Sequence, residues 1–251
     1  MAPGADNVVL EARGLRKAFG GVRAVSDCSF AVPRGKVCGL IGPNGSGKTT
    51  TFNLLTGILQ PDGGEVLHDG IDIAGLKPYR IFQRGITRTF QVTRVFREMT
   101  VLENMLAVTG LAVPERAARD RAGELIALVN LGHLRGEYAG RLSYGQQKLL
   151  EFARALMTDP DVILLDEPAA GVNRTLLQQL LDQIHRLQEA GKTILIVEHD
   201  MGVIMKHCER IFVMDYGVKI AEGTPTEIQG DERVIEAYFG RRRSGSVHDA
   251  G

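Results

Sequence analysis

The sequence predicts an α/β fold with a mixed, mainly parallel core sheet, an antiparallel β region and a helical region inserted into the chain. Two apolar runs, VILLD and TILIV, lack period-two alternation, which is typical of parallel strands covered on both faces. Helical patterns alternate with such runs after residue 159. A glycine-rich loop, IGPNGSGKTT, joins a third apolar run to a helix. These three observations together predict the fold class.

The first part of the chain contains strands, the glycine loop and one helix. Short apolar runs between residues 8 and 32 indicate antiparallel strands with a turn at Gly20 and Gly21. Residues 36–41 (KVCGLI) form a compact buried strand that leads directly into the loop. Residues 49–59 follow with apolar positions at helical spacing. The predicted order is therefore strands, glycine loop and helix.

The rest of the chain predicts a hairpin, helices and then alternating strands and helices. Residues 63–73 resemble a hairpin, and residues 86–91 a short strand. Between residues 100 and 157 the patterns are helical, in TVLENMLAV, PERAARDRAGELIALVNLGHL and YGQQKLLEFARALM. The last segments are VILLDEP, a helix over 174–189, TILIVEHD, a short helix, RIFVMDYG and a final helix near 235–238.

Composition excludes several classes of protein. The 251 residues carry 30 Lys and Arg against 30 Asp and Glu, so no overall field attracts nucleic acid, and none is expected as a partner. The three cysteines fit neither a disulfide framework nor a CxxC metal site. No apolar stretch approaches the roughly 18 residues that span a bilayer. We therefore expect a soluble, cytoplasmic chain that meets a membrane only through a partner.

The glycine loop predicts a nucleoside triphosphate site. It fits G-x-x-x-x-G-K-[ST], in which glycines let backbone N–H groups approach phosphate oxygens and the following helix start attracts the anion. An ordinary glycine turn before a helix is the alternative. The predicted nucleotide ligands here are Gly42, Pro43, Asn44, Gly45, Ser46, Gly47, Lys48, Thr49 and Thr50. Lys48 reaches the β- and γ-phosphates and Thr49 offers a hydroxyl to Mg²⁺.

Two carboxylates end the strand in VILLDEP. Asp166 can hold Mg²⁺, and Glu167 can accept the proton of the hydrolytic water. The carboxyl edge of an α/β sheet is where ligands gather. The alternative is a strand with two acidic residues at its solvated end. A residue that only capped a loop would tolerate Glu167→Gln, whereas a catalytic one would not.

His199 and Gln91 are weaker candidates. His199 follows TILIVE at another strand end, where it can bond the γ-phosphate or the attacking water. A lone histidine is more often structural. Gln91, at the end of ITRTFQ, can bridge Mg²⁺ and water, although a glutamine after a strand carries little information alone.

The stretch LSYGQQK provides a second anion site. Ser143 and Gln146 form a capping box, which is a structural interpretation by itself. Ser143, Gly145 and Gln146 also mark an exposed helix start, which attracts anions. Because this stretch lies far along the sequence from Lys48, its phosphate can belong to another subunit.

These motifs resemble the nucleotide-binding subunit of ABC transporters over residues 8–240. The matching motifs are GPNGSGKT, Gln91, LSYGQ, VILLDEP and EHD, in family order. The resemblance implies a P-loop NTPase ABC cassette with a helical subdomain over about 94–158, and we expect residues 241–251 to form a flexible tail. It also implies ATP and Mg²⁺ as cofactors, with Thr49, Gln91 and Asp166 near the metal and Phe19 stacked on adenine. A core phenylalanine is the alternative for Phe19.

The resemblance further implies an assembly of several proteins. In the family, the signature motif, which is LSYGQ in this chain, closes over the ATP held by a second ATPase subunit. This second subunit is identical or paralogous to the first. The segments RTFQVTRVFREMTVLENM, EPAAGVN and VIEAYFG look like ATPases of branched-chain amino-acid importers. This likeness implies integral membrane permease subunits, an extracytoplasmic solute-binding protein and a peripheral position on the inner membrane face. Phe96 and Met99 are candidate permease contacts, with helix packing as the alternative.

Two departures and several rival functions stay open at this point. Tyr144 replaces the first glycine of the usual LSGGQ, and Asn173 stands where aspartate is common. ATPases for urea or lipopolysaccharide transport share much of the pattern. Parts of it also fit a soluble ABC ATPase acting on ribosomes or DNA, a small-molecule P-loop kinase and a purely structural ATP-binding module.

Overall fold

The computed structural model describes residues 7–89, 92–110 and 113–239, in which strands and helices alternate along most of the chain. The strands are β1 (Val8–Phe19), β2 (Val22–Pro33), β3 (Val37–Ile41), β4 (Gly63–His68), β5 (Ile71–Asp72), β6 (Ile86–Arg88), β7 (Val162–Asp166), β8 (Thr193–Val197), β9 (Arg210–Asp215) and β10 (Val218–Gly223). The helices are α1 (Lys48–Leu55), α2 (Pro78–Phe82), α3 (Val101–Leu106), α4 (Glu115–Leu128), α5 (Tyr144–Ala155), α6 (Arg174–Glu189), α7 (Met201–His207), α8 (Pro225–Gly230) and α9 (Glu232–Phe239).

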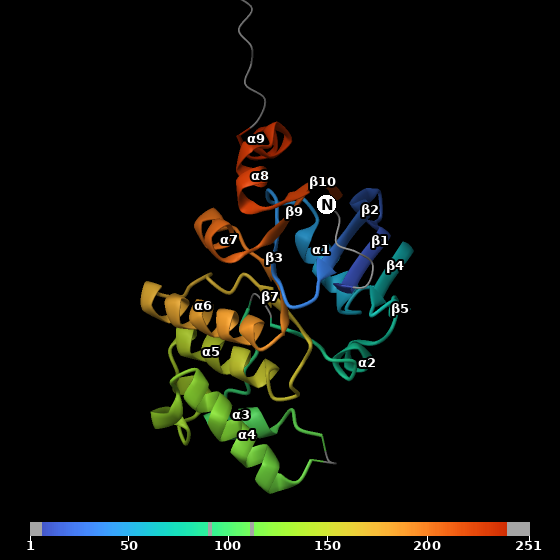
Figure 1. Cartoon of the computed structure of the whole chain (residues 1–251). Helices are drawn as coiled ribbons and strands as arrows, with labels where there is room; N and C mark the ends of the chain where they lie inside the picture. Colours follow the sequence, from blue (N-terminus) through green and yellow to red (C-terminus); the bar gives the residue numbers. More distant parts are fainter. Residues whose placement is uncertain (1–6, 90–91, 111–112, 240–251) are drawn as a thin grey trace, which may run out of the picture.

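The central sheet contains six strands in the order β10-β9-β3-β8-β7-β6 within the described part of the chain. Strands β9, β3, β8, β7 and β6 are parallel, and β10 pairs antiparallel with β9. Parallel neighbours bring their carboxyl ends to the same edge of a sheet. The loops that follow β3, β7 and β8 therefore meet at one edge (Figure 1).

Side chains of the parallel strands point alternately into two hydrophobic clusters. In β7, Val162 and Leu164 belong to one cluster, whereas Ile163 and Leu165 belong to the other. All four side chains are buried. Residues of α1 and the antiparallel sheet complete the first cluster, and residues of α6 and α7 the second. Both faces of the sheet are thus covered, which explains why VILLD is apolar throughout.

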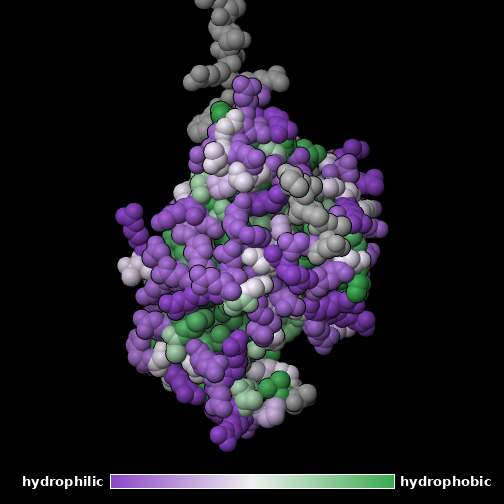
Figure 2. Space-filling model, viewed as in Figure 1, coloured by the Kyte–Doolittle hydropathy of each residue, from purple (hydrophilic) through white to green (hydrophobic). Residues whose placement is uncertain are grey.

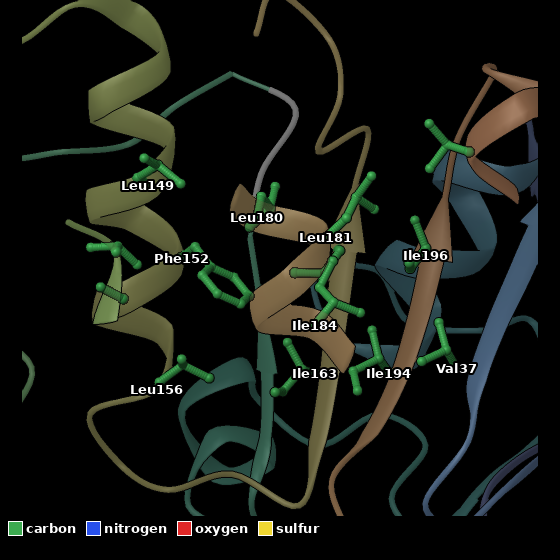
Figure 3. Packing of buried hydrophobic residues seen from close by; sticks show 14 of the residues in the cluster. Val37, Leu149, Phe152, Leu156, Ile163, Leu180, Leu181, Ile184, Ile194 and Ile196 are labelled. Carbon is green, nitrogen blue, oxygen red and sulfur yellow. The ribbon is translucent and has the colours of Figure 1, made fainter. Parts of the chain in front are cut away.

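The helices α3, α4 and α5 share a core with the central sheet. Figure 3 shows Phe152 projecting from α5 toward α6, while Ile184 of α6 lies between that helix and the strands. Met105 of α3 and Ile126 of α4 belong to the same cluster. This continuous packing fixes α5 beside α6 and the central sheet.

A second sheet is antiparallel, in the order β2-β1-β4-β5. It packs over α1, since Leu15 and Phe30 share a cluster with Phe52. The amide of Ser26 on β2 donates to the carbonyl of Gly217 at 2.7 Å. This bond joins the antiparallel sheet to the turn between β9 and β10, beside the glycine loop.

The element predictions are largely confirmed, and three elements were missed. The helix over 174–189 has its predicted bounds, and the hairpin over 63–73 appears as β4 and β5. The helix predicted to reach residue 59 ends at Leu55, and the strand predicted over 86–91 ends at Arg88. Helices α2 and α8 and strand β10 were not predicted; the two helices have at most six residues, too short for a clear periodic signal. The domain bounds 8–240 and 94–158 stay predictions, and residues 241–251 lie outside the described residues.

The face of the molecule seen in Figure 2 is mainly polar. Figure 2 shows a largely hydrophilic face with hydrophobic side chains gathered over part of the helical region near α5. No helix among the described residues is long and apolar enough to cross a membrane. The three cysteines are unpaired and buried, as expected of small apolar residues, and burial raises the pKa of Cys28 and Cys208 to about 12.

Candidate functional site: a nucleotide pocket at the sheet edge

The glycine loop leaves β3 in a conformation that only glycines allow. Gly42 and Gly47 have φ values of 153° and 101°. A Cβ on Gly42 would lie 2.1 Å from the carbonyl oxygen of Met214, and one on Gly47 would lie 2.4 Å from that of Ala24. The loop therefore packs directly on β2 and β9, and its backbone forms one wall of the site.

Lys48 is the first residue of α1 and its ammonium group points back into the loop. Its Nζ donates to the carbonyls of Gly42 at 2.8 Å and Pro43 at 2.9 Å, and lies 3.4 Å from the hydroxyl oxygen of Ser46. Burial lowers the pKa of Lys48, although the nearby charges of Glu167 and Asp166 oppose this shift. A buried cation held by oxygens of its own loop is ready to exchange them for phosphate oxygens.

An open hollow of about 750 Å³ lies in front of the loop. It is lined by Ala24, Asn44, Gly45, Gly47, Lys48, Thr49, Thr50, Glu167 and His199. Six of the nine residues predicted from the glycine loop, Lys48 among them, thus line one space with Glu167 and His199, two further residues with a predicted catalytic role. Gly42, Pro43 and Ser46 lie behind Lys48 and position its ammonium group.

Glu167 and His199 contact each other across this hollow. His199 Nε2 lies 2.7 Å from Glu167 Oε1, and because a carboxylate only accepts, the ring nitrogen is the donor. Glu167 has a positive φ of 48°, and its amide donates to the carbonyl of Val197 at 2.8 Å. The backbone therefore turns sharply after β7 and directs the carboxylate toward the end of β8.

Asp166, the last residue of β7, is buried and ion-paired. Arg88 Nη2 donates to Asp166 Oδ2 at 2.6 Å, with the two side chains 7% and 4% exposed. The sequence prediction placed Asp166 at this strand end, and it did not include Arg88. A threonine hydroxyl and a carboxylate are hard oxygen donors, so Thr49 and Asp166 fit the ligand chemistry of Mg²⁺.

The start of α5 is well formed but lies outside the hollow. Ser143 accepts from the amide of Gln146, and the Gln146 side chain accepts from the amide of Ser143, which confirms the predicted capping box. Ser143, Gly145 and Gln146 are not among the residues that line the space in front of Lys48. The structure therefore does not bring the signature and the glycine loop of one chain together.

Tyr144 packs against the loop that follows Glu167. A Cβ on Gly171, which has a φ of 70°, would lie 2.8 Å from the Tyr144 ring. Lys148 lies 5.6 Å from the centre of that ring and donates to the carbonyl of Glu167 at 2.7 Å. Asn173 caps α6 by accepting from the amide of Leu176 at 2.9 Å. The residue that departs from the usual signature thus links α5 to the loop after β7.

Phe19 and Gln91 stand apart from this geometry. Phe19, at the end of β1, is 48% exposed, so it is not a core phenylalanine. Lys17 lies 5.7 Å from the centre of its ring. Phe19 is not among the residues lining the hollow, and Gln91 lies outside the described residues.

Sequence reasoning also missed Lys148 and Glu198. Glu198 is 3% exposed and accepts from the amides of Ala169 at 2.6 Å and His199 at 3.1 Å. Burial raises its pKa, although these backbone bonds oppose the shift. A charged residue directly after a buried strand was the available signal, because such a residue must find partners. Glu198 thereby holds the loop after β7 beside His199.

Fold and site together define a P-loop nucleoside-triphosphate-binding protein. The family model described as "ABC transporter" matches residues 25–170, more than half of the chain. The chain belongs to the ABC transporter family of ATP-binding cassettes. A second model, described as "Branched-chain amino acid ATP-binding cassette transporter", matches residues 218–243.

Relatives and solved structures agree with this membership. The chain is 42% identical over 249 residues to the high-affinity branched-chain amino acid transport ATP-binding protein BraF of Pseudomonas aeruginosa, covering 92% of this chain and 98% of BraF. The ADP conformation of MJ1267, an ATP-binding cassette of an ABC transporter, superposes with a TM-score of 0.84 at 35% identity, covering 93% and 99% of the two chains. A dimeric post-hydrolysis state of the cassette MJ0796, bound to ADP and phosphate, gives 0.78 at 26% identity, covering 86% and 98%.

Proposed function

We propose that this chain binds ATP with Mg²⁺ and hydrolyses it to drive uptake of branched-chain amino acids through a membrane permease. The observation that carries the proposal is that Lys48, Glu167 and His199 line one hollow at the sheet edge. A phosphate-binding cation and a proton acceptor thus face the same space. This arrangement suits transfer of a phosphoryl group to water.

The loop and Lys48 hold the β- and γ-phosphates. Phosphate oxygens replace the carbonyls of Gly42 and Pro43 at the ammonium group, while loop amides and the start of α1 supply further positive ends. The oxygen of the attacking water forms a bond to the γ-phosphorus, while the bond from the γ-phosphorus to the ADP oxygen breaks. Glu167 accepts a proton from this water. The products are ADP and phosphate. His199 leaves its bond with Glu167 and holds the γ-phosphate or the water.

Thr49 and Asp166 would hold the Mg²⁺ ion, and Gln91 stays a predicted third ligand. When bound, the ion neutralises charge that develops on the phosphate oxygens. Thr49 is exposed at the mouth of the hollow, and Asp166 acts on Lys48 through its charge. Thr49 thus lines the hollow in front of Lys48, whereas Asp166 is buried and is not among the residues that line it.

A second ATPase subunit, identical or paralogous, completes the site. Ser143, Gly145 and Gln146 do not line their own chain's hollow. Ser143 is exposed at the start of α5, whereas Gly145 is buried within this chain. A helix start attracts anions. We place these three residues over the γ-phosphate held by the partner. Phe19 provides an exposed aromatic face for the adenine ring. The dimeric structure of MJ0796 supports this assembly.

A groove between α2, β6 and the helical region provides the permease contact. Ile58, Ile81, Phe82, Phe96 and Val108 line about 290 Å³ of space, with Arg154 at one side. Phe96 and Met99 are 48% and 39% exposed, so neither is committed to helix packing within this chain. A short amphipathic helix of an integral permease subunit fits such a groove. The chain would then lie on the cytoplasmic face of the membrane.

The transported solute is proposed from the relatives. BraF is named for branched-chain amino acid transport, and the model that matches residues 218–243 carries the same solute in its description. An extracytoplasmic solute-binding protein would deliver the amino acid to the permease.

The proposal is tested by reconstituting the chain with integral permease subunits and a solute-binding protein, which are to be sought among the genes adjacent to its own. Vesicles with ATP on the chain's side should accumulate radiolabelled leucine, and Lys48→Ala should abolish uptake. Urea uptake, or lipopolysaccharide extraction in place of leucine uptake, would reassign the solute. Hydrolysis stimulated by nucleic acid, without any uptake, would reject the transport function.

A further inference from the structure

The pair between Arg88 and Asp166 lies deeper than the rest of the site. Arg88 is the last residue of β6, and this strand pairs in parallel with β7, which ends at Asp166. The guanidinium and carboxylate meet at 2.6 Å, and both side chains are more than nine-tenths buried. A buried carboxylate requires a compensating charge, because transfer from water to the protein interior is costly.

Arg88 also binds the helix that carries Lys48. Its Nη1 donates to Asn53 Oδ1 at 2.6 Å and lies 3.3 Å from the hydroxyl oxygen of Thr56. The guanidinium carbon lies 5.6 Å from the centre of the Phe52 ring. One side chain thus joins α1 to the end of β7, and contacts from several directions fix its orientation.

The charge of Asp166 is therefore balanced before any nucleotide binds. Lys48 interacts with Asp166 only through space, because its hydrogen bonds go to the glycine loop. Arg88, in contrast, contacts the carboxylate directly. A metal ion and Arg88 are both cations, so each weakens the attraction of Asp166 for the other.

We infer that Arg88 is a positioning residue that neutralises Asp166 in the nucleotide-free protein, so that Mg²⁺ binds tightly only together with the phosphates of ATP. The inference rests on the proposed function, since it takes Asp166 as the metal-binding carboxylate. The inference adds a role for Arg88. This residue holds the Asp166 carboxylate in place and makes metal binding by Asp166 depend on bound nucleotide.

The test is a titration of the nucleotide-free, full-length protein with Mn²⁺, a paramagnetic substitute for Mg²⁺, followed by electron paramagnetic resonance. Arg88→Met keeps much of the length of the side chain and removes its charge. The Mn²⁺ affinity of this variant protein should therefore rise at least about tenfold over wild type. Arg88→Lys keeps the charge and should stay within about threefold of wild type. Arg210→Met removes another partly buried arginine, paired with Glu222 at the far side of the sheet, and should leave the titration unchanged.

A second variant without the charge of Arg88 allows the test if the first variant does not fold. If Arg88→Met fails to fold, Arg88→Gln keeps a donor for Asp166 and should show the same increase. Equal Mn²⁺ affinity in wild type and either folded neutral variant would overturn the inference. Adding Asp166→Asn to the neutral variant should abolish the increase, and an increase that persists would assign the metal to other ligands.

Asp166→Asn alone decides the matter if neither neutral variant folds. With Arg88 present, this change should alter nucleotide-free Mn²⁺ affinity by less than about threefold, and it should weaken Mn²⁺ binding in the presence of ATP at least about tenfold. A large loss without nucleotide would show that Arg88 does not neutralise Asp166. Wild-type ATP turnover, measured on the same preparation, tests the proposed function separately from the inference.

Discussion

The edge of the central sheet and the start of α5 differ in how completely their own chain satisfies them. At the sheet edge, Lys48 is held by loop carbonyls and Glu167 by His199. At the start of α5, the capping box satisfies Ser143 and Gln146, and neither residue lines the hollow in front of Lys48. The first region can hold a triphosphate alone. In the proposed function, the second region contributes its helix start to the nucleotide held by a partner subunit.

This difference indicates where control of hydrolysis lies. A region whose charged groups already pair with each other must exchange partners when nucleotide arrives, whereas a capped helix start needs only to be brought close. We therefore expect changes at the sheet edge to alter the chemical step and changes at α5 to alter assembly. Variants of the two regions, and of a pair remote from both, test this division, beginning with the largest expected effect.

Glu167→Gln should lower ATP turnover by roughly 10² to 10⁴, because an amide cannot accept the proton of the attacking water. ATP should still bind, since the loop and Lys48 are unchanged. Phosphate release and binding of a fluorescent ATP analogue measure the two quantities. Glu65→Gln changes an exposed glutamate on β4 and serves as the control. Turnover close to wild type would remove Glu167 from the chemical step.

Ser143→Ala should weaken ATP-induced dimerisation of the Glu167→Gln protein by roughly tenfold, because a hydrogen bond to a charged phosphate is lost. The change also removes a helix cap, which costs about 1 kcal/mol of stability. Thr224→Ala removes the equivalent cap of α8, remote from the site, and controls for that cost. Light scattering across a concentration series measures the dimer. Equal weakening in both variants would place Ser143 outside the interface.

Gly171→Ala should destabilise the fold by about 1–2 kcal/mol, because alanine is strained at a φ of 70° and its Cβ forces the Tyr144 ring to move. In a Tyr144→Gly background only the backbone strain remains. The two changes should therefore couple by at least about 0.5 kcal/mol in denaturant unfolding. Strict additivity would show that Tyr144 does not hold α5 against the loop after β7.

The smallest effect is expected from a histidine pair remote from both regions. His185 Nε2 and His207 Nδ1 lie 2.8 Å apart. Burial first, and then the charges of His185 and Lys206, lower the pKa of His207, while Asp182 opposes them. A lowered pKa means that the unfolded state binds more protons, so stability falls as pH decreases below about 6.5.

His207→Gln should therefore reduce the loss of Tm between pH 7.5 and pH 5.5, by less than about 3 °C. The KM for ATP should not change, because the pair lies outside the nucleotide hollow. Thermal unfolding at the two pH values measures the effect. An identical pH dependence in both proteins would show that the pair does not titrate in this range.

The sequence reveals features that depend on one short stretch of chain. The glycines around Lys48 have the spacing of the phosphate-loop motif, and β7 and β8 are continuous apolar runs. The helix cap at Ser143 depends on only four residues, 143–146. All of these are confirmed. Their physical causes act locally, through backbone conformation, burial on two faces and the unsatisfied amides of a helix start.

Features that depend on contacts between distant segments were not predictable. Arg88 and Asp166 are separated by 78 residues, and neither segment indicates that a guanidinium will meet the carboxylate. The same holds for Lys148 and Glu167, and for Glu198 and Ala169. The register of the sheet and the packing of α5 beside it decide these pairings. The residues predicted to bind nucleotide therefore follow from the sequence more directly than the residues that position them.

The alternation of β7 between two buried faces has a consequence for its two terminal carboxylates. Deleting any one residue from 162–165 would shift Asp166 and Glu167 by about 3.3 Å along the strand. Strand residues beside the deletion would then point to the opposite face of the sheet. The odd or even count of residues along this strand thus decides which acid meets Arg88 and which meets His199. An insertion or deletion within β7 should consequently prevent the chain from folding into this structure. Substitutions among the apolar residues of β7 that preserve volume should be tolerated.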